Sequence, residues 1–354
     1  MGMKKLEELA LTTSDISAVL PKVIKKQVEE AREEKLYMLQ LWRQDKSLVG
    51  KPGKSLHITK VSGTIGWAFL SEGEDIESAL SAQERTFTDV EITPIKIGTW
   101  IQITREAIKS AQYNIVDMHI DRATFDLADG LDTYLYKTMV GATTTTESIA
   151  GSGTSTYSLS HGKILKVNSV KIGDTATTGY KIDYYDGKIK LAGTTSGTVT
   201  VSYVYSTFDN VYDASTTGRL TYTDFVKART ELLSKKWQPN VAIISPTLEG
   251  WLLKDERFTD ASKYGSREVL LNGEIGKLAG LKIITTHNAY DVLVVVDSPK
   301  FGLVVWKEPL EVFTKEDEAT YSVKIYFYEM VGAKVIWEDA VAIVTNTQSD
   351  AEDL

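Results

Sequence analysis

The sequence contains no cysteine and only four histidines among its 354 residues. Without cysteine the chain has no disulfide framework, no thiolate metal ligand and no cysteine nucleophile. The histidines fall in four separate segments, without the H-E-x-x-H spacing of a zinc enzyme: His57, His119, His161 and His287. We therefore predict neither a cofactor nor a bound metal.

Long apolar runs are also missing. No stretch of about 18 apolar residues exists, and the first residues lack the apolar core of a signal peptide. We therefore expect neither a membrane span nor secretion. The net charge of −8 argues against sequence-specific nucleic-acid binding, which usually needs a basic face. A weakly acidic container that surrounds nucleic acid without tight phosphate contacts remains compatible with this charge.

One short stretch resembles a phosphate-binding loop. Gly53-Lys54-Ser55 matches the second half of the G-x-x-x-x-G-K-[ST] pattern, but Leu48 stands where the first glycine belongs. The stretch also joins a predicted helix to a predicted strand, which is the reverse of the required order. A Pro-Gly turn explains these residues without a ligand.

Other candidate sites are equally weak. His119, Asp121 and Asp126 are spaced by two and five residues, which puts them on different faces of a predicted helix. Ser245 lacks the Gly-x-Ser-x-Gly context of a nucleophile elbow, and residues 316–318 have the pattern of an exposed acidic loop. No acid–base or nucleophile constellation emerges, so we predict that the chain is not an enzyme.

Two unusually long strands are predicted between residues 55 and 104. Each spans about 15 to 20 residues, or about 50 Å, whereas ordinary strands have about five or six residues. Such a pair predicts an arm that leaves its own domain and covers other molecules, with an acidic connection at its tip. A charged, amphipathic helix is predicted over residues 21–42, and it packs either on its own domain or on a neighbour. The end of this helix and the arm supply the candidate intersubunit residues: Trp42, Trp67, Phe69, Glu72, Glu74, Asp75, Glu77 and Phe87.

Three further regions follow the arm. Apolar residues at steps of three and four predict one long helix over residues 113–140, closed by Gly141. The Thr-, Ser-, Gly- and Tyr-rich residues 143–210 predict a small all-β module of about five strands, with a hairpin turn at Tyr185-Asp186-Gly187-Lys188. From residue 221 an α/β pattern begins, with a helix whose predicted N-cap is Thr223.

This order of parts resembles the major capsid proteins of tailed bacteriophages and related archaeal viruses, which share the Hong Kong 97-type fold. The segments that carry the resemblance are "AIISPTLEGWLL" (242–253), "NGEIGKLAGLKIITTHNA" (272–289) and "EATYSVKIYFYEMVGAKVIWEDAVAIVT" (318–345). The resemblance implies an α+β fold with an inserted all-β domain. Its implied parts are an N-terminal arm (1–54), an extended loop hairpin (55–104), a spine helix (105–142), the insertion (143–212), an axial domain (213–310) and closing strands (311–354).

The resemblance also implies a function and partners. Family members assemble as hexamers and pentamers into an icosahedral shell around double-stranded DNA, in the host cytoplasm, and the shell becomes part of the virion. A scaffolding protein and a portal are the implied partners, DNA is contacted non-specifically, and a decoration protein is a further possible partner. The alternative is the shell of an encapsulin-type compartment, although those chains usually lack such a β insertion.

Two departures limit what the resemblance carries over. Only about 50 residues precede the predicted arm, so we expect either a mature-length chain or a separate scaffolding protein. The prototype links its subunits through a lysine of the extended loop, but no lysine lies between Val61 and Ile95 here. We therefore expect no covalent crosslink of that kind.

Overall fold

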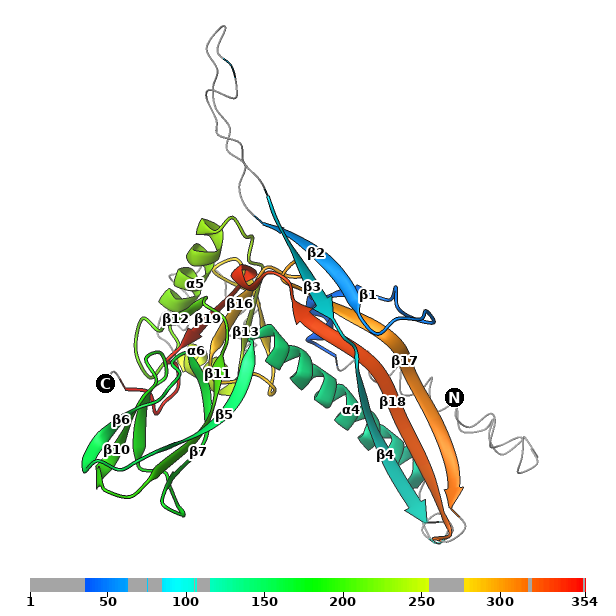
Figure 1. Ribbon diagram of the computed structural model, residues 1–354, viewed down its shortest axis with the longest axis horizontal. Coiled ribbons are helices and arrows are strands. Elements are labelled where there is room, and N and C mark those ends of the chain that lie inside the picture. The colour runs from blue at the N-terminus through cyan, green and yellow to red at the C-terminus, as the bar shows by residue number, and fades with distance from the viewer. Residues whose placement is uncertain are drawn as a thin grey trace, which may run out of the picture.

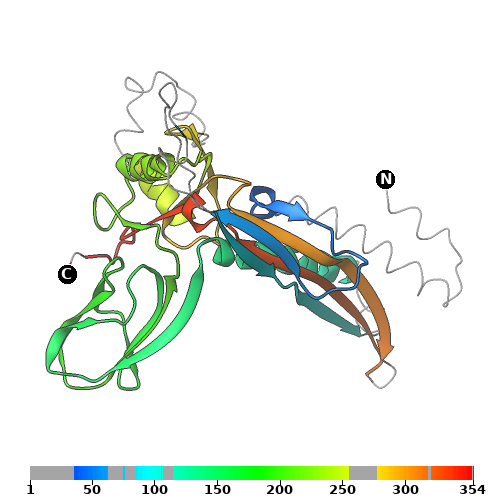
Figure 2. The same ribbon diagram turned by 45° about the horizontal axis from the view of Figure 1, so that its top comes forward.

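The structure is a computed structural model that describes residues 36–62, 75, 85–104, 106, 115–254, 277–317, 320–352 and 354. The chain forms an elongated α+β molecule with three parts (Figure 1). A limb consists of one long helix on a four-stranded sheet, a central body is built on a six-stranded sheet, and a lobe contains two small sheets. A two-stranded hairpin projects from the junction of limb and body (Figures 1 and 2).

The limb packs the predicted long helix against one face of its sheet. Helix α4 (Ile115–Met139) confirms the prediction from apolar spacing, and Gly141 follows it with φ +60°, a left-handed conformation that glycine adopts without strain. The sheet has the order β1-β17-β18-β4, with antiparallel pairing except between β1 and β17. Its strands are β1 (Arg43–Asp45), β4 (Ile95–Thr104), β17 (Gly302–Asp317) and β18 (Ser322–Val335).

The prediction of a single long second strand in the arm is wrong, because the structure divides that segment into two separate strands. Its first half, β3 (Thr86–Ile92), pairs with β2 (Leu56–Ser62), whereas its second half is β4 of the limb. The break falls at Thr93 and Pro94, and proline cannot donate a hydrogen bond to a strand ladder. The hairpin is therefore a two-stranded ribbon over its described part, and Trp100 belongs to the limb.

The central body has a six-stranded sheet with the order β12-β19-β16-β13-β15-β14. Helices α5 and α6 pack their apolar faces on it, around fully buried Phe225, Leu232 and Leu248. Helix α5 begins with a capping box in which Thr221 and Asp224 each bond to the other's backbone, so the N-cap is Thr221 and the prediction of Thr223 was wrong. The elements are β12 (Val211–Asp213), α5 (Tyr222–Ser234), β13 (Val241–Ile244), α6 (Pro246–Lys254), β14 (Lys277–Leu278), β15 (Leu281–Thr285), β16 (Leu293–Val296) and β19 (Val341–Thr345).

The lobe, here called the β module, comprises residues 142–206 and has seven strands where about five were predicted. They form two sheets, with orders β5-β11-β7-β8 and β6-β10-β9, that enclose buried Val201, Tyr203 and Ile189. The predicted hairpin turn lies between β9 and β10, where Gly187 has φ +71°. The strands are β5 (Ala142–Ile149), β6 (Thr154–Ser158), β7 (Ile164–Ile172), β8 (Thr175–Thr177), β9 (Tyr180–Asp183), β10 (Lys188–Thr195) and β11 (Val199–Ser206).

The first described residues form no regular α-helix, so the predicted helix does not extend to Trp42. A single 3-10 turn, η2 (Leu39–Leu41), leads into extended backbone at Trp42. The indole of Trp42 packs edge-on against Phe301, with ring centroids 4.6 Å apart, and it also covers Gly302, where a side chain would collide with the ring. Only 3% of Trp42 is exposed. A second 3-10 turn, η3 (Glu338–Ala340), precedes β19.

A buried carboxylate holds this segment on the long helix. The carboxylate of Asp132 on α4 accepts hydrogen bonds from the backbone N–H groups of Tyr37 (3.2 Å) and Met38 (3.3 Å). Burial raises the pKa of Asp132 to about 6, against the opposing effect of these two bonds. Asp129, which raises this pKa, and His287, which lowers it, are the charged neighbours.

We expect the stability of the protein to depend on the ionisation of Asp132. Because the folded-state pKa of about 6 lies above the ordinary value of 3.8, the stabilisation is complete below pH 4 and is lost as pH rises through 6. The Asp132→Asn variant should lack this dependence. Chemical denaturation at pH 5 and pH 7.5 should show wild type losing on the order of 1 kcal/mol relative to the variant at the higher pH. If the difference in unfolding free energy between wild type and variant were the same at both pH values, the raised pKa of Asp132 would be contradicted.

Candidate intersubunit surfaces

Most of the predicted contact residues lie outside the described residues: Trp67, Phe69, Glu72, Glu74 and Glu77. Asp75 is described and exposed. Phe87 on β3 is 68% exposed, an unusual position for a phenylalanine of a folded chain. Trp42 has its place inside its own chain, as described above, so its ring is not available to a neighbour. This part of the hypothesis is corrected, because Phe301 and Gly302 provide a pocket that the sequence spacing did not reveal.

The root of the hairpin is anchored to the limb and the body. Ile92 at the end of β3 is 2% exposed and belongs to a small apolar cluster with Leu48 and Leu303. The ammonium group of Lys60 on β2 lies 4.6 Å from the ring centre of Trp337, a cation–π contact. Lys334 donates a hydrogen bond to the carbonyl of Glu91 (3.1 Å). These contacts of β2 and β3 set the direction in which the hairpin leaves the molecule.

The glycine-containing loop before β2 does not form an anion-binding cradle. The ammonium group of Lys307 donates to the carbonyl oxygens of Lys51 (2.5 Å) and Gly53 (2.8 Å). A phosphate site needs N–H groups directed at the ligand, whereas this loop directs its oxygens at a lysine. Its role is to attach the hairpin to β17.

One face of the limb sheet is covered by no element among the described residues. It is here called the aromatic face and is defined by Trp100, Phe313, Tyr326 and Tyr328. Strand residues alternate between faces, so Ile97, Ile325 and Phe327 lie against α4. The rings of the other face stack in pairs: Trp100 with Tyr326 (6.1 Å between centroids) and Phe313 with Tyr328 (5.1 Å). Trp100 is 55% exposed and Phe313 is 47% exposed. This face was not predicted as a contact surface, although the alternation of residues in β4 and β18 indicates it.

Lysines lie beside the aromatic face. The ammonium group of Lys96 lies 4.2 Å from the ring centre of Tyr328. Lys324, on the same face, pairs with Asp317 at 2.6 Å, and this hydrogen bond lowers the pKa of Asp317 to about 2. The surface combines exposed rings with charges of both signs, because Glu311 on the same face accepts a hydrogen bond from the Tyr328 hydroxyl (2.9 Å). Among these charges, the ammonium group of Lys96 lies directly over a ring.

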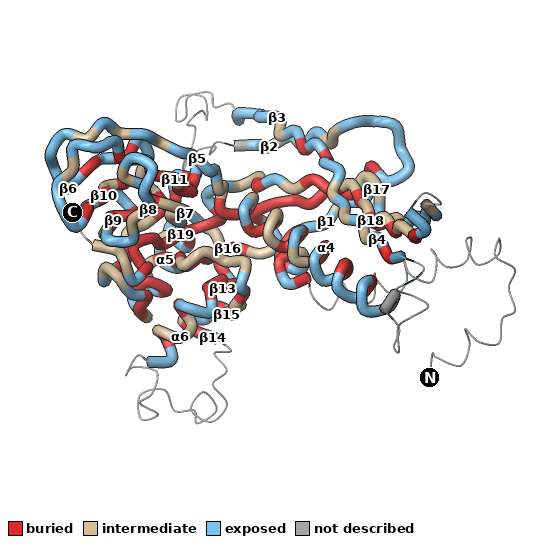
Figure 3. The backbone as a smooth tube through the Cα atoms, turned by 90° about the horizontal axis from the view of Figure 1, so that it is seen from below, coloured by how far each residue is buried: buried red, intermediate tan, exposed pale blue. Residues whose placement is uncertain are grey.

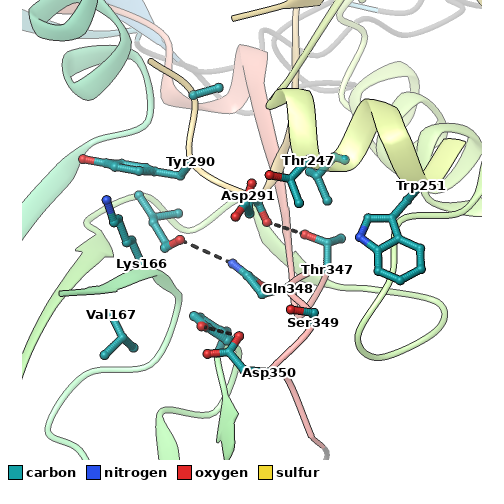
Figure 4. A pocket seen from close by; sticks show the side chains of 14 residues that line it. Lys166, Val167, Thr247, Trp251, Tyr290, Asp291, Thr347, Gln348, Ser349 and Asp350 are labelled. Atoms are coloured by element: carbon teal, nitrogen blue, oxygen red, sulfur yellow. Dashed lines mark hydrogen bonds between the residues drawn. The ribbon is translucent and has the colours of Figure 1, made fainter. Parts of the chain in front are cut away.

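A pocket of about 390 Å³ lies where the β module, α6 and the C-terminal residues meet. Figure 4 marks hydrogen bonds between some of the residues that line it. Gln348 donates to the carbonyl of Leu165 (3.3 Å), and Thr347 donates to the carbonyl of Asp291 (2.6 Å). The Tyr184 hydroxyl donates to Asp350 (2.8 Å). These bonds fasten the lobe to the body, and the described residues that line the pocket contain no nucleophile–base pair.

The metal candidate on α4 is not assembled either. Asp126 forms an ion pair with Arg122 at 3.1 Å, one turn away on the same helix. Among the described residues no three His, Asp or Glu side chains are grouped as metal ligands, and no described helix is long and apolar enough to cross a membrane.

Two substitutions on β3 should distinguish the buried root of the hairpin from its exposed part by their effects on the free energy of unfolding. Ile92→Ala creates a cavity in a buried cluster and should cost about 2–5 kcal/mol in the free energy of unfolding. Phe87→Ala removes an exposed ring and should change that free energy by less than about 0.5 kcal/mol. Chemical denaturation of the isolated subunit measures both. Equal effects of the two substitutions would show that Phe87 is part of its own subunit's core.

Comparisons with known proteins show the fold. No protein-family model matches the chain, and no curated protein sequence matches it. Among solved structures, a chain from Mycobacterium phage Che8 is 15% identical, with a TM-score of 0.58 over 89% of this chain and 92% of that one. A chain of the capsid of cyanophage P-SCSP1u is 12% identical, with a TM-score of 0.58 over 90% and 89%.

A third example is a chain of the mature capsid of bacteriophage PhiM1, which is 11% identical, with a TM-score of 0.56 over 90% of this chain and 87% of that one. Identities this low leave no detectable sequence relationship, while the coverage extends over nearly the whole of each chain. The protein therefore has the α+β fold of these three phage chains.

Proposed function

We propose that this protein is a major capsid protein, a structural subunit that assembles as hexamers and pentamers into an icosahedral shell around double-stranded DNA. One observation supports the proposal: the chains of two phage capsids, those of P-SCSP1u and PhiM1, share the fold over 90% of this chain. The exposed aromatic face and the projecting hairpin support it, because both need neighbours to cover them.

We propose that the parts of the structure correspond to those that the sequence resemblance implied. We assign the hairpin β2–β3 to the extended loop, α4 to the spine helix, the limb sheet to the peripheral domain and the six-stranded sheet to the axial domain. The β module is then an insertion between spine helix and axial domain, and we propose that it faces outward. Figure 3 supports this division, since the hairpin and the margins of the module are mostly exposed.

The aromatic face and the tip of the hairpin have complementary chemistry. The tip contains four acidic residues, with Trp67 and Phe69 before them, and the aromatic face presents rings beside Lys96. We propose that the hairpin of one subunit docks on the limb of the next, with its acidic tip residues near basic groups: Glu72, Glu74, Asp75 and Glu77. Charge complementarity of this kind favours correct docking more than it adds affinity.

The second candidate is the shell of an encapsulin-type compartment. It shares the need for self-assembly, and the β module argues against it, as in the sequence analysis. A cargo-enzyme gene beside the gene for this chain would favour the compartment, whereas portal and terminase genes would favour the virus. We propose no catalytic activity for either assembly. Ser55 hydrogen-bonds to His57 (3.3 Å) and His57 to Asp89 (2.6 Å), but the His57 and Asp89 side chains are more than half exposed on the surface of the hairpin.

The proposed partners follow from the shell. A scaffolding protein and a portal would act during assembly in the host cytoplasm, and packaged DNA would meet the inner surface without sequence-specific contacts. A decoration protein on the β module is a further proposed partner. The net charge of −8 agrees with a container that surrounds DNA without gripping it.

Electron microscopy of the purified protein should show closed, icosahedral particles. The double variant Trp100→Ser, Phe313→Ser should remain folded, because both rings are exposed, but should reduce particle formation at least tenfold. Tyr185→Ser is the matched control, since Tyr185 is 40% exposed on the β module, away from the limb. Normal particles from the double variant would refute the role of the aromatic face. A wild-type protein that remains a solitary monomer would refute the shell.

Particles should dissociate into monomers when boiled in denaturant. No lysine lies between Val61 and Ile95, so the part of the hairpin beyond Lys60 cannot supply an amine for an isopeptide bond. A denaturing gel of purified particles should show one band at the mass of the chain, 39.2 kDa. A ladder of covalent oligomers would contradict this prediction.

A further inference from the structure

The two sheets of the β module have four edge strands, and all but β5 are short, irregular or covered. On the three-stranded sheet, the C-terminal residues cover β9: Ala351 pairs in parallel with Ile182, which exchanges backbone hydrogen bonds with Asp350 (3.2 Å) and Glu352 (2.9 Å). The opposite strand, β6, has five residues, and its pairing with β10 is irregular. On the four-stranded sheet, β8 is only three residues long. Short, irregular or covered edges are the usual defences against unwanted strand pairing.

Strand β5 has none of these defences. It pairs with β11 over eight consecutive residues without a bulge, and within the described residues no strand pairs with its outer side. Its sequence, "ATTTTESI", contains no lysine and no proline, and its one charge is Glu147. β-Branched threonines favour extended backbone. In Figures 1 and 2, β5 runs along the margin of the lobe with its outer side open.

We propose that β5 is an interaction edge, and that its partner is β5 of a second copy, paired antiparallel about a two-fold axis. The inference rests on the proposed shell only in that a shell brings many copies together. A two-fold pairing centred on Thr145 or Thr146 aligns seven residues of each strand. It places Glu147 opposite Thr143 in the first register and opposite Thr145 in the second.

The charges and faces of β5 favour these two registers. Pairing centred on Glu147 would set two carboxylates opposite each other, which is destabilising, whereas threonine pairs across strands are favourable. The carboxylate of Glu147 is also held inward, where it accepts hydrogen bonds from the Tyr203 hydroxyl (2.9 Å) and the Ser160 backbone (3.0 Å). The outward side chains of Thr144, Thr146 and Ser148 are exposed and uncharged, so a second copy meets no repulsion.

The absence of cysteine from the chain makes a crosslinking test specific. The test uses the double variant Thr144→Cys, Thr146→Cys. In the register centred on Thr145, the cysteine introduced at position 144 of one copy lies opposite the cysteine introduced at position 146 of the other. In the register centred on Thr146, the two cysteines introduced at position 146 lie opposite each other. Mild oxidation of assembled particles should therefore convert most of the protein to a disulfide-linked dimer on a non-reducing gel.

The matched control is Thr200→Cys, Ser202→Cys on β11, on the same face of the sheet, and it should stay monomeric. Strands lie about 4.8 Å apart, so the two β11 strands would be about 14 Å apart, beyond the reach of a disulfide. Particles in which the β5 variant also stays monomeric would overturn the pairing while leaving the shell function intact. Amide hydrogen exchange gives a second measurement: protection of residues 142–149 on assembly, without a dimer band, would mean that a different strand covers the edge, and would also overturn the proposal.

The oxidation experiment tests the pairing even if the protein forms no particles. The concentrated soluble variant is then oxidised in the same way. A dimer band from the β5 variant and none from the β11 control would support the pairing independently of the shell, and the absence of that band would overturn both ideas.

Discussion

The arrangement of the molecule depends on one helix that is buried in two different cores. The first half of α4 packs Ile120, Ala123 and Leu127 against the sheet of the limb. Its second half packs Leu131, Leu135 and Met139 into the core that includes the central sheet. A helix of 25 residues is a stiff rod of about 37 Å, so packing at both ends sets the direction of the limb relative to the body.

The same arrangement explains why the limb exposes aromatic rings. Helix α4 covers only one face of the four-stranded sheet, and no other described element covers the opposite face. A compact domain would close over such a surface with a second layer. Here the limb extends away from the rest of the described chain, so none of the described elements supplies that layer. The exposed face is thus a direct consequence of the extended shape.

The lobe is joined to the body by buried polar groups as well as by apolar contacts. The side chain of Asn346, which is 1% exposed, donates to Asp183 (3.1 Å) and Asp213 (2.8 Å) and accepts from the Tyr184 backbone (2.6 Å). One amide therefore links the β module, β12 and the chain after β19. Buried polar networks of this kind specify a single arrangement, because an unsatisfied partner would be costly. The position of the lobe is set by these residues, which lie far apart in the sequence.

The sequence by itself determined the long helix, the α/β order after residue 221 and the all-β character of residues 143–210, because hydrophobic periodicity and turn residues are local signals. It also pointed to a fold that needs neighbours. Only the tertiary structure decided that the predicted arm divides at Pro94, that Trp42 is buried on Phe301, and that Trp100 lines up with Phe313 and Tyr326. These outcomes depend on which strands pair, and strand pairing joins residues more than 200 positions apart, which no local pattern encodes.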